Sequence, residues 1–151
     1  MREVEMIAYK VVERGTRWCS NWALFKQYLL DDGTPEEYVR GVRFRKEHPE
    51  LFPRYHKGSI VKAAIGSVGI MCFPSERHAE SFKGYSRRLS HSLMIIRVEG
   101  IGKPRQPTSV IARCGKCPWN LAEMSQVETS RFRDDVEKGS IITFPTVRVL
   151  D

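Results

Sequence analysis

The sequence has no apolar run long enough to cross a membrane. Its apolar stretches are short, and the one at residues 68–73 is far below the roughly 18 residues that a spanning helix needs. The first residues include acids and no apolar leader, so no targeting segment is expected. We therefore expect no membrane association and a cytoplasmic location, in the cell that makes the protein or in a host cell.

Motifs of catalysis are also absent. The chain has four histidines, and none forms a His-Glu-x-x-His pair; no Gly-x-Ser-x-Gly elbow and no phosphate-binding Gly-x-x-x-x-Gly-Lys-Ser/Thr loop occurs. Because the sequence has no motif for a catalytic nucleophile, a catalytic metal or a phosphate loop, it favours a non-enzymatic protein that uses no cofactor.

Cysteine is scarce, with four residues, and only Cys114 and Cys117 lie close together. Their spacing is that of half a zinc knuckle or of a redox pair. A structural zinc site needs two more ligands, which Cys19, Cys72 or a histidine would have to supply. Trp119 follows the pair, whereas in thioredoxin-type motifs the tryptophan precedes it. We expect two plain thiols in a turn, with zinc as the alternative cofactor.

Positive charge is plentiful and unevenly placed. The net charge is +7, and residues 40–119 hold 16 Lys/Arg against 5 Asp/Glu, while both flanks are mildly acidic. A basic centre of this kind indicates an anionic partner, although solubility alone would also explain it.

The basic residues are interleaved with aromatic ones in three clusters. Cations contact phosphates and nearby rings stack on bases, so this pattern predicts a surface for nucleic acid or a nucleotide. An acidic protein would satisfy the same charges. In the alternative interpretation the cations form a solvated face, and Phe44 and Tyr55 lie in the core. The predicted ligand-binding residues are Arg40, Arg43, Lys46, Arg54, Tyr55, Lys57, Lys83, Tyr85, Arg87 and Arg88.

The hydrophobic pattern predicts one α+β domain over residues 1–151, with a mostly antiparallel sheet and two or three helices. Helices are expected at residues 21–31, 34–46 and 75–83, with Asn21, Thr34 and Ser75 as N-caps. Strands are expected near residues 4–12, 59–65, 68–73, 93–98 and 141–150, with another possible at 108–112. The apolar run at 68–73 is expected to be a central strand.

Several segments match a known pattern: Tyr9-Lys10-Val11-Val12, residues 55–63, residues 69–75 followed by Ala79 and Phe82, and the ending at 138–150. In these segments the chain resembles a group of small uncharacterised proteins encoded by phages and viruses. The resemblance implies a strand-turn-strand-helix motif and implies no activity. Residues 18–52 depart from the group and are expected to form a helical insertion, as a lobe or lid against one edge of the sheet.

Gln126-Val127-Glu128 has the Gln-x-Glu form of ADP-ribosyltransferases, and the strand-to-helix pattern is similar to theirs. This resemblance implies an alternative function as an NAD-using enzyme, in which Glu128 orients the nicotinamide ribose and Gln126 is the other catalytic residue of the motif. The first strand has Tyr9-Lys10 where that class uses an arginine or a histidine.

Three functions follow from these patterns. The first is a non-enzymatic basic protein that binds nucleic acid or a nucleotide, and the second is the NAD-using enzyme. The third is an inhibitor or interaction protein that binds an acidic host protein. An exposed strand edge would also support a homodimer.

Overall fold

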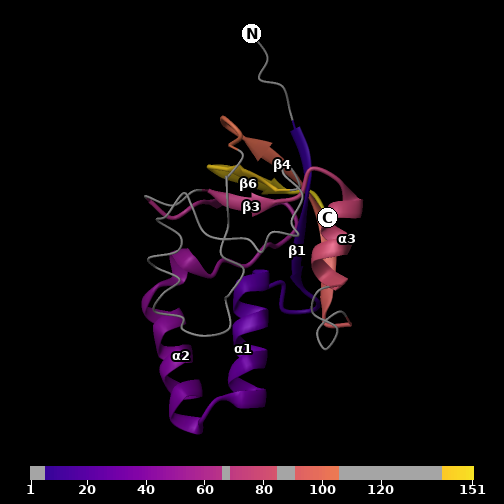
Figure 1. Ribbon diagram of the computed structural model, residues 1–151. Coiled ribbons are helices and arrows are strands. Elements are labelled where there is room, and N and C mark those ends of the chain that lie inside the picture. Colours follow the sequence, from indigo (N-terminus) through magenta and orange to yellow (C-terminus); the bar gives the residue numbers. More distant parts are fainter. Residues whose placement is uncertain (1–5, 66–68, 85–90, 106–140) are drawn as a thin grey trace.

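The computed structural model describes residues 6–65, 69–84, 91–105 and 141–151 (Figure 1). These residues form an α+β fold, as the sequence predicts. The helices are α1 (Ser20–Asp32), α2 (Pro35–Glu47) and α3 (Glu76–Gly84), with a 3-10 turn at Pro49–Leu51. The strands are β1 (Met6–Glu13), β2 (Ile60–Lys62), β3 (Ile70–Cys72), β4 (Leu93–Ile101), β5 (Ile142–Phe144) and β6 (Thr146–Val149).

The strands form two antiparallel sheets. Four of them pair in the order β1-β4-β6-β2, and β3 pairs with β5 in a separate two-stranded sheet. The expectation that residues 68–73 form a central strand of one sheet is therefore wrong. Pro145 separates β5 from β6, and because proline has no amide proton to donate, the chain turns there and each half pairs in its own sheet.

The two sheets are joined at a second place. Tyr9 of β1 and Phe73, just after β3, exchange backbone hydrogen bonds of 2.9 and 2.8 Å. Gly100 in β4 lies under the ring of Phe144, since a Cβ atom there would be 2.1 Å from the ring. A glycine is therefore needed at position 100, because any side chain there would collide with the Phe144 ring.

Both faces of β1 are buried. Ala8 and Val12 belong to the main core, which includes Trp22 and Leu29 of α1. Val11 lies on the opposite face, in a second cluster with Ala79 of α3 and Leu93. Figure 1 shows α3 beside β1 and β4, which agrees with this second cluster.

The helix starts follow the predicted caps in two cases of three. Thr34 accepts a hydrogen bond of 3.2 Å from the amide of Glu37, and Ser75 accepts one of 3.2 Å from the amide of His78. The prediction for Asn21 is wrong. Helix α1 begins at Ser20 and Cys19 is its N-cap residue, because Cys19 is held opposite Val12 by a β-bridge.

Residues 18–52 are helical, as the sequence predicts, and contain α1, α2 and the 3-10 turn. Helices α1 and α2 lie side by side and extend away from the sheets (Figure 1). No helix within the described ranges is long and apolar enough to span a membrane.

Candidate functional site

A tight turn after β1 begins the candidate site. Gly15 and Arg17 both have positive φ angles, 84° and 61°. The amide of Arg17 donates to the carbonyl of Glu13 at 2.9 Å, and the amide of Glu13 donates to the carbonyl of Trp18 at 2.8 Å. The chain therefore reverses within four residues and places Trp18 beside the end of β1.

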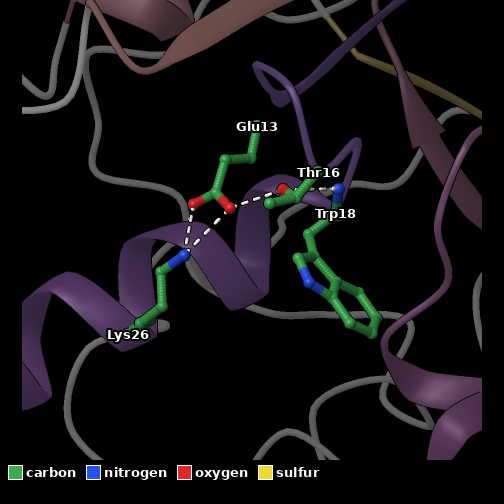
Figure 2. A network of polar contacts seen from close by, with 4 residues as sticks. All are labelled: Glu13, Thr16, Trp18 and Lys26. Carbon is green, nitrogen blue, oxygen red and sulfur yellow. Dashed lines mark hydrogen bonds and ion pairs between the residues drawn. The ribbon is translucent and has the colours of Figure 1, made fainter.

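A polar network fixes this turn against α1 (Figure 2). The ammonium of Lys26 lies 2.7 and 2.9 Å from the two carboxylate oxygens of Glu13. The hydroxyl of Thr16 donates to Glu13 at 2.5 Å and accepts from the amide of Trp18 at 3.4 Å. Glu13 is only 7% exposed, so its charge needs these partners.

Trp18 lies directly opposite Arg54 in a β-bridge. Side chains opposite each other in such a pair share a face, and the Cζ atom of Arg54 is 4.1 Å from the centre of the Trp18 ring. Arg45 of α2 reaches the same ring at 4.7 Å and the ring of Trp22 at 4.6 Å. We call Arg54, Trp18, Arg45 and Trp22 the arginine–tryptophan stack.

The inner end of the stack is fixed in the core. Trp22 is 1% exposed and meets Phe52 edge-to-face, with ring centres 5.7 Å apart. Trp18 and Arg45 are half-buried, and Arg54 is exposed. The stack thus runs from the hydrophobic core to the solvent and ends in a guanidinium group.

Neither guanidinium group of the stack has a hydrogen-bond acceptor among the residues that the structure describes. Within the described part of the chain, no hydrogen bond or ion pair is formed by the side chain of Arg45 or Arg54. By contrast, Arg17 donates to the carbonyl of Tyr55 at 2.6 Å and also to the backbone oxygen of Asp151. Each guanidinium has five donors, so the stack offers many donors that the described residues do not satisfy.

Arg40, Arg43 and Lys46 are all exposed and form the outer face of α2. This agrees with the spacing seen in the sequence. Glu36 and Glu47, four residues from Arg40 and Arg43 respectively, are also exposed on α2. The outer face therefore carries mixed charge.

The other predicted residues are dispersed. Lys57 is exposed and its charge helps to lower the pKa of Asp151, while Lys83 is half-buried at the end of α3. Tyr55 is 2% exposed, and burial raises the pKa of its hydroxyl well above the usual value. Its ring lies in the core and not on the surface, which is the alternative that the sequence left open.

Seven predicted site residues fall outside the described residues, together with the strand expected at 108–112. Their roles in ligand, zinc or NAD binding stay predictions. These residues are Tyr85, Arg87, Arg88, Cys114, Cys117, Gln126 and Glu128.

A second group of buried polar side chains surrounds Lys10. Lys10 is 5% exposed, donates to the carbonyl of Met71 at 2.8 Å and lies 5.2 Å from the centre of the Tyr55 ring. Burial raises the pKa of Cys19 and of Cys72 to about 11, and the charge of Lys10 partly offsets it. Both thiols therefore stay protonated near neutral pH and are poor nucleophiles there.

The ligand-binding residues predicted from the sequence do not include Trp18, Trp22 or Arg45. Trp18 and Trp22 are four residues apart, and Arg45 follows Tyr38 and Val42 on the inward stripe of α2. The sequence signal for this site was Arg45 on an otherwise apolar stripe of α2, because a cation on such a stripe needs an aromatic ring or an acidic group as its partner.

Comparison of the chain with protein families, curated proteins and solved structures gave no match.

Proposed function

We propose that this protein is a non-enzymatic binder of an anionic ligand, a nucleic acid or a nucleotide, and that it acts in the cytoplasm. The observation that carries the proposal is the arginine–tryptophan stack. Two guanidinium groups are held against indole rings, and their donors have no acceptor among the described residues.

Rigidity makes these arginines suited to binding. An arginine in solution loses side-chain entropy when it grips a phosphate, whereas Arg45 and Arg54 are already held by rings. Guanidinium donors bind phosphate oxygens in pairs, and such charge-assisted hydrogen bonds are among the strongest that side chains form. The site is therefore prepared for a phosphate group.

The remaining cations would act at longer range. Lys57 and the outer face of α2 are exposed and would raise the local concentration of an anion. Arg87 and Arg88 are predicted to add direct contacts. These groups favour a polymer with many phosphates over a small anion.

Fluorescence anisotropy with a labelled oligonucleotide, measured over a range of salt concentrations, tests the proposal. We expect the affinity to fall as salt rises, because binding releases counterions. Arg54→Ala is expected to weaken binding by about tenfold and to reduce the salt slope by about 0.7 to 0.9. Arg77→Ala, which removes the same charge from an exposed position in α3, is the matched control.

Salt-independent binding, or no binding, would contradict the proposal. Equal losses for Arg54→Ala and Arg77→Ala would show that net charge matters and the stack does not. The double variant Arg87→Ala with Arg88→Ala tests the predicted contribution of that pair in the same assay.

An acidic protein is the second candidate partner, since carboxylates would accept from the same unsatisfied donors. Capture from nuclease-treated lysate distinguishes the two, because a protein partner survives that treatment. The NAD-using alternative depends on Gln126 and Glu128, and no observation on the described residues favours it. Glu128→Ala, with turnover and folding measured together, is its test.

A homodimer also remains a proposal. Strand β2 lies at one edge of the four-stranded sheet, and its Ile60 is 54% exposed. Such an edge offers backbone groups to a second copy. The native mass of the purified protein tests this proposal directly.

A further inference from the structure

The indole rings of the stack are already in contact with cations or buried. Trp18 has one guanidinium 4.1 Å and another 4.7 Å from its ring centre, and Trp22 is 1% exposed. A nucleic-acid base that stacked where either guanidinium contacts Trp18 would have to displace Arg45 or Arg54. The aromatic side chains therefore support the arginines and do not form the stacking surface themselves.

Arg54 is the exposed member of the stack. Its backbone is paired with Trp18, its guanidinium rests on the Trp18 ring, and the residue is open to solvent. A guanidinium group is planar and delocalised, so it stacks on flat π systems as well as donating hydrogen bonds in its plane. Because Arg54 is exposed, the part of its guanidinium that does not contact Trp18 is accessible to a ligand.

We infer that the ligand is a single-stranded segment of nucleic acid and that one of its unpaired bases stacks on the guanidinium of Arg54. This inference rests on the proposed function. In a duplex the bases are stacked on one another inside the helix, so their flat faces are not accessible to Arg54. In a single strand a base is free to cover Arg54 while the neighbouring phosphate accepts from the guanidinium donors.

Four probes at one salt concentration test the inference: an unstructured oligonucleotide of about 12 nucleotides, the same strand in a duplex, the same strand with abasic sites, and inorganic polyphosphate. We expect the single strand to bind about tenfold more tightly than the duplex. An oligonucleotide with abasic sites keeps its phosphates and lacks bases, so it should bind as weakly as polyphosphate. The comparison of the intact and the abasic strand tests base stacking with the wild-type protein alone.

Arg54→Lys keeps the charge and removes the planar group. It is expected to lower affinity for the single strand about tenfold and to leave polyphosphate binding within about twofold. Arg77→Lys at an exposed position of α3 is the matched control and should change neither. Thermal melting of each variant shows that the fold is retained.

The outcomes separate this inference from the proposed function. Equal affinity for the single strand, the duplex and the abasic probe would overturn stacking on Arg54 and leave the anion site standing. An equal loss of affinity for all probes in the Arg54→Lys variant would also overturn stacking on Arg54 and leave the anion site standing. Absence of binding to every probe would overturn both, and binding of polyglutamate alone would favour the acidic-protein partner in their place.

Discussion

The outer face of α2 and the arginine–tryptophan stack differ in how their cations are held. On the outer face, Arg40, Arg43 and Lys46 are exposed and share the helix with Glu36 and Glu47. In the stack, Arg45 and Arg54 lie against indole rings. Exposed charges among opposite charges are screened by salt and contribute little individually, whereas guanidinium groups fixed on rings are oriented before a ligand arrives.

The geometry of the helix produces this difference. Arg43 and Arg45 are two residues apart in α2 and therefore point in nearly opposite directions. One faces solvent and the other reaches Trp18 and Trp22. The density of basic residues in the sequence does not distinguish them, so the direction of each side chain must be known before a site can be assigned.

Trp18→Ala is the largest expected disruption of the stack. Both guanidinium groups lose a ring, so we expect affinity for the oligonucleotide to fall by more than about tenfold and stability by about 2 kcal/mol. Anisotropy and thermal unfolding measure the two effects. Val39→Ala, which truncates a residue 57% exposed on α2, is expected to change neither.

If Trp18→Ala bound as well as the wild type, the stack would be a structural feature and the outer face of α2 would become the leading candidate. That result would mean that the exposed cations of α2, and not the stack, bind the ligand. A variant that stays stable but loses affinity would most clearly confirm that the stack binds the ligand.

Glu13→Gln tests the network that holds Trp18 in place. Removing the carboxylate leaves Lys26 without its partner, and Lys26 is 27% exposed, so some of the loss is relieved by water. We expect a loss of about 2 kcal/mol, less than for a fully buried pair. Glu80→Gln on the exposed side of α3 should stay within about 0.5 kcal/mol in the same urea titration.

Arg45→Lys compared with Arg43→Lys is the most direct test of how the cations are held. Both changes keep the charge and both lie in α2. Arg45→Lys is expected to cost about 1 kcal/mol, because a lysine loses the planar contact with two indoles, and Arg43→Lys is expected to cost almost nothing. Equal values in thermal unfolding would mean that the ring contacts of Arg45 add no stability.

Asp151→Asn gives the smallest expected effect and concerns an arginine that already has a partner. Arg97 donates to the carboxylate of Asp151 at 2.9 and 3.1 Å, and these hydrogen bonds lower the pKa of Asp151 below 3.8. The folded state therefore gains stability from the ionised form. That gain is present above about pH 4 and is lost as the pH falls through the lowered pKa.

Melting temperatures of the wild type and Asp151→Asn should consequently differ slightly near neutral pH and converge under acid. Ligand affinity should be the same for both at neutral pH, since the paired Arg97 is no part of the stack. A change in affinity would show that the binding surface extends to Arg97 and would weaken the distinction between paired and unpaired arginines.

Local chemistry made much of the fold predictable. The Thr34 cap, with Pro35 in the first turn, fixes the start of α2, and the Ser75 cap does the same for α3, because each depends on neighbouring residues only. The start of α1 was misplaced because Cys19 is held by a bridge to Val12, a contact between segments. The division into two sheets was missed for the same reason, since strand partners are distant in sequence.

The sequence by itself determined the α+β class, the helical character of residues 18–52 and the excess of positive charge in the centre of the chain. These depend on composition, periodicity and caps, which are short-range properties. Only the tertiary structure decided that Tyr55 enters the core and that Arg54 and Arg45 meet at Trp18. A cation becomes part of a site through the rings and acceptors around it, and those come from segments that meet only when the chain folds.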